Sequence, residues 1–241
     1  MHNNDLQTGR LMSRRVALAL LGAAGAALLA GRAAWSSAAE SARSCVASPE
    51  QTEGPYFVDE RLNRSDIRSD PADGAVREGV PLTLSLLISS AAAGKCSPPA
   101  GATVDLWHCD AAGAYSDARD SGFNTAGKKF LRGYQVTDSS GSARFTTIYP
   151  GWYDGRAVHL HFKVRGAAAS KRNYEFTSQL YFDDAFTDRV YARNPYARRG
   201  PRTVRNSRDS IFRDGGNRLI LPVIASDEGY AANFNVVLRL A

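Results

Sequence analysis

Apolar and polar residues alternate along several short stretches of the chain, and a period of two is typical of β-strands with one buried face. The stretch VPLTLSLLI at residues 80–88 is an example. Further stretches of this kind are residues 102–109, 130–137, 143–149, 157–165, 176–182, 217–225 and 234–240. Turn-forming clusters such as DSSGS and PGWYDG separate them. The pattern predicts an all-β fold, an antiparallel β-sandwich.

Residues 184–214 lack this alternation and are rich in arginine. Asp188, Asp209 and Asp214 interrupt the arginines, which favours a solvated, salt-bridged surface over a phosphate-binding strip. We expect long loops and short helical turns here, packed over one end of the sandwich.

The first 39 residues have the layout of a signal peptide. Arg14 and Arg15 precede an apolar run, residues 16–30, and small residues follow it. The run is too short for a membrane span, and the paired arginines resemble the signal for twin-arginine export. We therefore predict that residues 1–39 are removed, that residues 40–241 form the mature domain, and that the protein is exported to the periplasm or beyond the cell.

Length and charge limit the possible classes of function. A chain of 241 residues with 44% hydrophobic content can bury one good core. The predicted signal peptide holds four arginines and one aspartate, so only +3 of the total charge of +6 belongs to the remainder. This charge is too small to indicate a nucleic-acid partner, and no membrane contact is expected after the signal is removed. The sequence gives no information about the oligomeric state of the protein.

The chain has three cysteines, Cys45, Cys96 and Cys109. In an oxidising compartment two of them can form a disulfide and leave one thiol over, and the sequence does not say which two. A zinc site built from cysteines is not indicated, because the chain has no C-x-x-C pair.

The stretch YPGWYDGRAVHLHF at residues 149–162 contains two of the four histidines in the chain. His159 and His161 lie two residues apart on a predicted strand, so both imidazoles project from the same face. Single histidines are usually hydrogen-bonded structural residues. A pair on one strand face, close to tyrosines, indicates a metal site instead.

The remaining ligands decide which metal the histidines would bind. The cupin pattern, with an acidic residue a few positions after the pair, is absent. Asp154 could complete a two-histidine, one-carboxylate iron(II) site. Tyr149 and Tyr153 are better candidates by proximity, because a phenolate is a hard, anionic donor that favours ferric iron, and metal binding displaces a proton otherwise lost near pH 10. A secreted zinc or copper enzyme that uses His159 and His161 remains an alternative.

Four segments together resemble the intradiol ring-cleavage dioxygenases, the family of catechol 1,2-dioxygenase and protocatechuate 3,4-dioxygenase. The segments are EGPYF (53–57), VDLWHCDAAGAYSD (104–117), FTTIYPGWYDGRAVHLHF (145–162) and SQLYF (178–182), in the family's order. The resemblance runs from about Cys45 to the C-terminal strands. It is greatest to the exported, single-domain branch, which also has TEGPY and WHCDA.

This resemblance implies one non-haem iron(III) per chain, held by two tyrosines and two histidines. The implied ligands are Tyr115, Tyr153, His159 and His161. Arg156 corresponds to the family's active-site arginine and Gln179 to the glutamine on the following strand. Pro55 and Tyr56 match a segment that helps to wall the substrate pocket.

By the same resemblance, the partners are a small aromatic diol and O2, and the product is a cis,cis-muconate-type diacid. Tyr153 would leave the iron as the catechol binds. Arg156 would stabilise charge that develops on the substrate, since a guanidinium stays protonated and presents several donors. Catechol, protocatechuate and hydroxyquinol all suit this chemistry.

Some positions have competing interpretations. Tyr149 rivals Tyr153 as a ligand, but Pro-Gly-x-Tyr places Tyr153 at the family position and leaves Tyr149 at the end of a strand. His108 and Trp107 lie on a predicted strand, and we expect them to pack or hydrogen-bond near the site. A non-catalytic, transthyretin-like binding module is a further alternative, although all four implied ligands are present. The short interval between Tyr153 and His159 predicts a more open pocket rim than in better-known members.

Overall fold

The computed structural model describes residues 46–92, 95–99, 101–166 and 174–239. The predicted signal peptide, residues 1–39, and Cys45 lie outside the described residues. Within the described ranges, no helix is long and apolar enough to cross a membrane.

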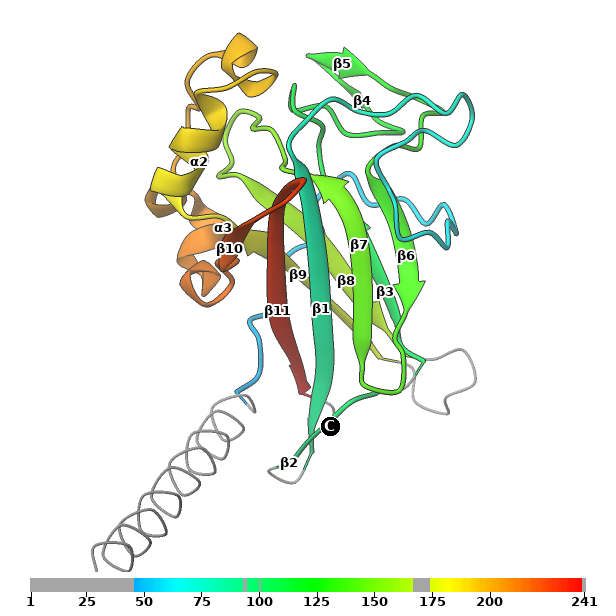
Figure 1. Cartoon of the computed structure of the whole chain (residues 1–241). Coiled ribbons are helices and arrows are strands. Elements are labelled where there is room, and N and C mark those ends of the chain that lie inside the picture. The colour runs from blue at the N-terminus through cyan, green and yellow to red at the C-terminus, as the bar shows by residue number, and fades with distance from the viewer. Residues whose placement is uncertain (1–45, 93–94, 100, 167–173, 240–241) are drawn as a thin grey trace, which may run out of the picture. The chain divides into compact units, whose positions relative to one another are not determined.

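The fold is an all-β sandwich of two sheets (Figure 1). The strands are β1 (Pro81–Ala92), β2 (Lys95–Ser97), β3 (Thr103–Trp107), β4 (Arg119–Asp120), β5 (Phe123–Asn124), β6 (Arg132–Val136), β7 (Ser142–Ile148), β8 (His159–Arg165), β9 (Glu175–Tyr181), β10 (Val223–Ser226) and β11 (Gly229–Arg239). One sheet has the order β10-β11-β1-β2, with β7 also paired to β1, and the other has the order β6-β3-β8-β9. Strands β4 and β5 form a separate hairpin.

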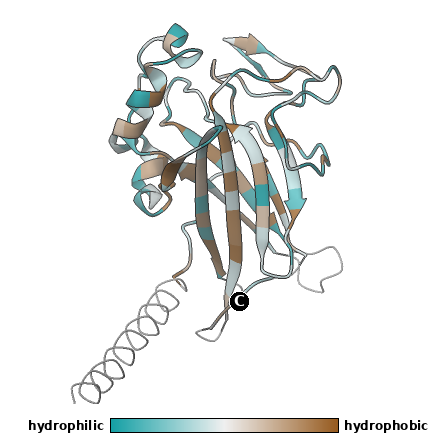
Figure 2. Cartoon of the chain, viewed as in Figure 1, coloured by the Kyte–Doolittle hydropathy of each residue, from teal (hydrophilic) through white to brown (hydrophobic). Residues whose placement is uncertain are grey.

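The core lies between the two sheets. On β1, Leu82, Leu84, Leu86 and Ile88 are fully buried, and the residues between them are not. Figure 2 shows hydrophobic bands along this strand. These side chains share one hydrophobic cluster with apolar residues of β3 and β8. Alternation with a period of two is therefore the pattern of a sheet with one face in the core.

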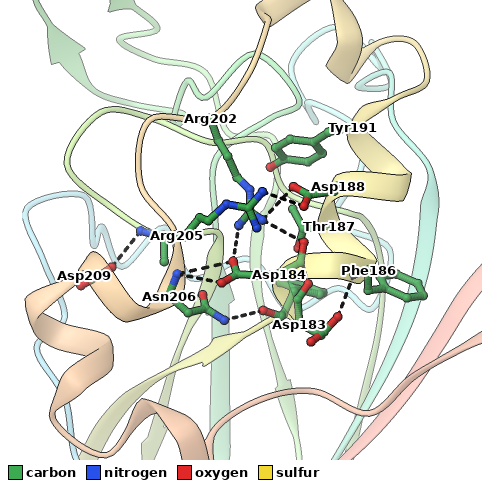
Figure 3. A network of polar contacts seen from close by, with 12 residues as sticks. Asp183, Asp184, Phe186, Thr187, Asp188, Tyr191, Arg202, Arg205, Asn206 and Asp209 are labelled. Carbon is green, nitrogen blue, oxygen red and sulfur yellow. Dashed lines mark hydrogen bonds and ion pairs between the residues drawn. The ribbon is translucent and has the colours of Figure 1, made fainter.

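The arginine-rich segment forms short helical turns beside the sheets, as predicted (Figure 1). They are α2 (Asp184–Tyr191), η1 (Tyr196–Arg199), η2 (Asn206–Arg208), α3 (Ser210–Arg213) and η3 (Gly216–Arg218). The segment is salt-bridged and most of its arginines are exposed, as predicted. Arg202 is buried between Asp184 and Asp188 of α2 (Figure 3).

Two strand predictions need correction. Residues 217–225 were expected to form one strand, but only the end of that stretch does, as β10. The apolar side chains of Leu219 and Leu221 are buried outside any strand, and a short apolar run cannot be assigned by pattern alone. The sheet is also not wholly antiparallel, because β1 and β11 pair in parallel.

Candidate metal centre

The candidate site lies where β8 begins. His159 and His161 are the first and third residues of β8, and antiparallel pairing places Gln179 of β9 opposite His161 on one side and Trp107 of β3 opposite it on the other. The Trp107 and His161 rings stack with their centroids 5.0 Å apart. This stacking fixes the plane of one imidazole.

The two imidazoles point their Nε2 atoms at each other, 3.0 Å apart. His159 Nδ1 donates to the carbonyl oxygen of Ala157 at 2.6 Å, so in the neutral ring Nε2 carries a free lone pair. Burial, with the nearby charge of Arg156, lowers the pKa of His159 to about 3. Burial and the adjacent His159 lower the pKa of His161 well below its ordinary value. Both side chains are therefore neutral, the form in which histidine binds metals.

Two tyrosines from separate loops lie beside this pair. Tyr153, in the loop between β7 and β8, has its hydroxyl 3.2 Å from His159 Nε2. Tyr115, in the loop after β3, is buried, and its hydroxyl has no hydrogen-bond partner among the described residues. Its ring centroid is 5.6 Å from that of Tyr153 and 6.1 Å from that of His161. All four implied ligands thus meet in one place.

The donor set suits a bound metal cation. Metal–imidazole bonds of about 2.1 Å at right angles would separate two donor atoms by about 3 Å, and the Nε2 atoms of His159 and His161 are 3.0 Å apart. A cation would also satisfy the hydroxyl of Tyr115, which is otherwise costly to bury. Within the described ranges no group of three or more His, Cys, Asp and Glu side chains could hold a metal. A metal held here by more than two of the described side chains therefore needs a further residue type, and the tyrosines supply it.

Burial opposes ionisation of these tyrosines while no cation is present. Burial and the neighbouring Tyr153 raise the pKa of Tyr115 well above its ordinary value. Burial raises the pKa of Tyr153 to about 12, although the positive charge of Arg156 acts in the opposite direction. A trivalent cation is the kind of charge that displaces such protons, which connects the tyrosines to ferric iron.

Two glycines allow the backbone to approach closely around the site. Gly113, with φ +85°, lies where a Cβ atom would stand 2.2 Å from the carbonyl oxygen of Trp152. This contact packs the loop that carries Tyr115 against the loop that carries Tyr153. Gly54, with φ +70°, passes so near the His161 ring that a Cβ atom would lie 3.3 Å from it. Larger residues would push these segments apart.

The segment that contains Pro55 and Tyr56 crosses β8 and β9. Gln179 Nε2 donates to the carbonyl oxygen of Thr52 at 2.8 Å, and Lys163 forms an ion pair with Glu53 at 2.5 Å. Pro55 itself is exposed. Tyr56 stacks on Tyr115 with ring centroids 4.4 Å apart. The predicted pocket wall therefore lies against an implied ligand.

Sequence reasoning missed two polar residues that hold Tyr56. The hydroxyl of Tyr56 donates to Asp120 of the β4–β5 hairpin. The guanidinium of Arg132, which is buried, donates to the backbone carbonyl of Tyr56 at 3.3 Å and to Ser116 Oγ at 2.6 Å. Arg132 thus ties the Tyr56 segment to the loop after Tyr115.

Arg156 lies just before β8 and faces the site. Its Nη1 atom is 3.5 Å from His159 Nε2, and its Nη2 atom donates to Gln179 Oε1 at 2.6 Å. Gln179 is fully buried and also accepts a hydrogen bond from the Tyr181 hydroxyl at 3.0 Å. The structure therefore brings Arg156 and Gln179 together beside the histidines.

Asp209 is a further residue that sequence reasoning missed at this site. Its buried carboxylate accepts a hydrogen bond from Arg156 Nε at 2.9 Å. Burial disfavours its charged form, but the Ala157 amide and the charge of Arg156 hold the pKa of Asp209 below its ordinary value. The sequence signal available was only that of a helix N-cap, Asp before Ser-Ile-Phe, which says nothing of Arg156.

Three other candidates do not join the donor set. Tyr149 bonds through its hydroxyl to Thr187 Oγ1 at 2.7 Å in the core, and is therefore not a rival of Tyr153. Asp154 is exposed, and its carboxylate accepts from Thr203 Oγ1 at 3.1 Å. His108 has both ring nitrogens bonded, Nδ1 to the carbonyl of Cys109 at 2.8 Å and Nε2 to Thr147 Oγ1 at 2.6 Å. It is structural, as expected.

The cysteines separate into two kinds. Cys96 is disulfide-bonded. Cys109 is a buried free thiol whose Sγ donates to the carbonyl oxygen of Gly151 at 3.4 Å. Burial raises the pKa of Cys109, which keeps it protonated and makes it a poor ligand or nucleophile.

Comparison with known proteins places this geometry in a family. The sequence profile of the family described as dioxygenase matches residues 52–207, which is more than half of the chain. The chain is 28% identical over 196 residues to the protocatechuate 3,4-dioxygenase beta chain of Burkholderia cepacia, a match that spans 77% of this chain and 76% of that protein.

Solved structures agree with the sequence comparison. The intradiol ring-cleavage dioxygenase of Tetranychus urticae is similar, with a TM-score of 0.69 and 29% identity over 81% of this chain and 95% of that chain. The dioxygenase domain of a dioxygenase–carbohydrate-binding protein fusion from Streptomyces sp. SirexAA-E has a TM-score of 0.57 and 28% identity, over 81% of this chain and 100% of that one. The chain therefore belongs to the intradiol ring-cleavage dioxygenases, a family of oxidoreductases that act on catechol-type substrates.

Proposed function

We propose that this protein is a non-haem iron(III) enzyme that cleaves a catechol between its two hydroxyl-bearing carbons with O2 to give a cis,cis-muconate-type diacid. One observation carries the proposal. Two imidazole nitrogens 3.0 Å apart, a phenol oxygen 3.2 Å from one of them, and a second, buried phenol that has no hydrogen-bond partner in the described part of the chain come together in one place.

Each residue at this point has a distinct role in the proposal. Tyr115, Tyr153, His159 and His161 would hold one iron per chain. When bound, ferric iron would withdraw electron density from a catecholate and so prepare the ring for O2. Tyr115 is fully buried beneath Tyr56, whereas Tyr153 is partly exposed, so Tyr153 is the phenolate that can leave and take up a catechol proton at its oxygen. Arg156 would bind and orient the substrate, and Gln179, which is fully buried, would hold the Arg156 guanidinium in place.

The test combines metal analysis with oxygen consumption. We expect the purified protein to contain one iron per chain, to absorb visible light through phenolate-to-iron charge transfer, and to consume O2 with at least one of catechol, protocatechuate and hydroxyquinol. Tyr149→Phe, which removes a core hydroxyl bonded to Thr187, is a matched control that should keep both colour and activity. A colourless protein fully loaded with zinc, or one that binds no metal, would refute the proposal.

The two tyrosine ligands can be separated by their spectra. Tyr153→Phe should alter mainly the colour of the resting protein, because Tyr153 leaves when catechol binds. Tyr115→Phe should alter the colour of the catechol complex as well. Identical changes in the two variants, recorded with and without catechol, would contradict these roles.

We further propose that the protein is exported after removal of residues 1–39, leaving residues 40–241. The disulfide at Cys96 supports an oxidising compartment. Replacing both Arg14 and Arg15 by lysine should keep the full-length chain inside the cell, since the paired arginines are the proposed signal. Fractionation of cells that express the two forms measures this, and export of the double variant at the normal level would exclude the twin-arginine route.

A further inference from the structure

The guanidinium of Arg156 is held by two of its three nitrogens. Nε donates to Asp209 Oδ2 at 2.9 Å and Nη2 donates to Gln179 Oε1 at 2.6 Å. The third nitrogen, Nη1, is left 3.5 Å from His159 Nε2. Because a guanidinium is planar, fixing two nitrogens fixes the direction of the third.

Asp209 is itself fixed by backbone amides. Its Oδ2 atom also accepts from the Ala157 N–H at 2.8 Å, and its Oδ1 atom accepts from the N–H groups of Ile211 and Phe212 at 2.8 and 3.2 Å. The carboxylate therefore joins the turn before β8 to the start of α3. Both of its oxygens are used, and its side chain is fully buried.

The segment that carries Asp209 is anchored to α2 (Figure 3). Arg202 bonds to Asp184 and, at 2.9 Å, to Asp188, and Asn206 Nδ2 donates to the carbonyl oxygen of Phe182 at 2.8 Å. The amide of Asp209 donates to the carbonyl oxygen of Asn206 at 3.2 Å. The position of the carboxylate is therefore set by the scaffold, without help from a substrate.

We propose that Asp209 is a positioning residue that holds Arg156 with its Nη1 edge turned toward the site. This rests on the proposed function, in which Arg156 stabilises charge on the substrate. An arginine side chain that is not held loses rotamer entropy when it is ordered. A donor that is already oriented contributes more to turnover than one that must be ordered during the reaction.

Asp209→Asn is the sharpest variant. An asparagine can keep its oxygen toward Ile211 and Phe212, but its NH2 group then meets the N–H of Arg156 Nε and that of Ala157, so that donors face donors. We expect kcat to fall by about 10- to 100-fold. This loss should not exceed the loss caused by Arg156→Ala, which removes the donor group completely. Iron content and the resting spectrum should stay unchanged, since no proposed ligand is touched.

Two further variants make the result interpretable. Asp209→Ser keeps a good N-cap for α3 but cannot reach Arg156, so it should lower kcat in the same way if the asparagine variant folds poorly. Asp183→Asn is the matched control, because Asp183 caps α2 by accepting from the Phe186 amide at 2.7 Å and bonds to no arginine within the described ranges. It should leave kcat unchanged.

A double-mutant cycle separates positioning from general stability. If Asp209 acts through Arg156, Asp209→Asn should lower kcat little further in an Arg156→Ala background, because residues that share one interaction are not additive. Independent structural damage would instead multiply the two losses. The proposal would be overturned if the two factors by which the single variants lower kcat multiply in the double variant. A kcat for Asp209→Asn at the wild-type level would also overturn it.

A second readout needs neither iron nor activity. In 1H–15N spectra of the metal-free protein, the Nε–H signal of Arg156 should be protected from exchange with water in the wild type and in Asp183→Asn, and lose protection in Asp209→Asn. Unchanged protection in Asp209→Asn would overturn the proposal. If the wild type cleaves no catechol, the proposed function fails, and this signal alone then decides whether Asp209 orients Arg156.

Discussion

Arg202 and Arg156 are both paired with carboxylates and largely shielded from solvent, and they differ in what their remaining edge meets. Arg202 directs both Nη atoms at the acids of α2, Asp184 and Asp188 (Figure 3). Arg156 gives only its Nε edge to a carboxylate, Asp209, and leaves Nη1 beside His159. The ion pairs of Arg202 hold the fold together. The ion pair of Arg156 leaves one nitrogen, Nη1, facing the site.

Tyrosines and histidines show the same contrast. Near α2, the Tyr149 hydroxyl bonds to Thr187, whereas the Tyr115 hydroxyl at the site has no partner among the described residues. His108 has both nitrogens bonded to protein groups, whereas His159 turns Nε2 toward His161. Residue type therefore does not mark the site. Unsatisfied polar atoms alone do not mark it either, because Tyr174 Oη and Arg202 Nε also lack a partner among the described residues. The site is marked by tyrosine and histidine donor atoms that come together in one place.

The largest effect should follow from removing a histidine of the site. Even outer partners of a metal ligand cost about 10- to 100-fold when changed, so His159→Ala or His161→Ala should lower ring cleavage by more than about 100-fold and empty the site of iron. His108→Ala, which disrupts only bonds to Thr147 and Cys109, should keep its iron. Iron per chain and O2 uptake are measured together, and full iron content in either site variant would contradict the assignment.

Substitution of Arg156 should affect mainly activity, and substitution of Arg202 mainly stability. Arg156→Ala should lower kcat by about 100-fold, as for the loss of one charge-stabilising donor, with iron content nearly unchanged. Lysine should rescue poorly, because an ammonium lacks the planar fork. Full activity of Arg156→Ala, or loss of its iron, would refute this role.

Arg202→Ala should lower kcat much less than Arg156→Ala, because Arg202 acts on the site only through the segment that carries Asp209. This variant should lower the free energy of unfolding by about 2 kcal/mol, from lost charged hydrogen bonds. The loss is small because solvent screens the partners of Arg202: the Asp184 side chain is 27% and the Asp188 side chain 44% exposed. Denaturant unfolding of the purified variants measures the difference. A catalytic defect in Arg202→Ala as large as that in Arg156→Ala would remove the contrast between the two arginines.

The sequence predicts the long strands well and the short or irregular parts badly. β1 alternates because one face is buried, and this is visible without any structure. Strands β2, β4 and β5 have only two or three residues, too few to show a period. Residues 219–225 form a continuous apolar run, and burial inside an irregular segment gives the same pattern as a strand.

The site divides in a similar way. The four implied ligands were found through motifs that resemble a family, and the structure brings them together. Simple alternation would turn Arg156 away from His159, but β8 begins only at His159, so the rule does not apply before it. Asp209 lies 53 residues from Arg156, and no local pattern records a contact between residues so far apart.

His108 should make stability depend on pH. Burial lowers its pKa to about 4, whereas an unfolded histidine titrates near 6.5. A lowered histidine pKa in the folded state means that stability present above pH 6.5 is lost as the pH falls toward 4, because the unfolded chain binds the proton more readily. We expect the wild type to lose on the order of 2 kcal/mol relative to His108→Gln over this range. Unfolding curves at several pH values test it, and a constant difference would show that His108 does not titrate in this way.

The smallest effect, and the finest test of the contrast, concerns two hydroxyl groups in the metal-free protein. Tyr149→Phe removes a hydroxyl bonded to Thr187 at 2.7 Å and leaves the threonine oxygen with only its bond to the carbonyl of Asp183. It should lower the free energy of unfolding by about 1 kcal/mol, the usual net value of a buried hydrogen bond. Tyr115→Phe removes a buried hydroxyl without a partner among the described residues, so it should cost nothing and can even stabilise the metal-free fold.

With iron bound, the order of the two effects should reverse, because Tyr115 then supplies a proposed ligand and Tyr149 does not. Denaturant unfolding of both variants, with and without iron, measures this. A loss from Tyr115→Phe in the metal-free protein as large as that from Tyr149→Phe would mean that the site satisfies its own hydroxyl and leaves nothing for a metal.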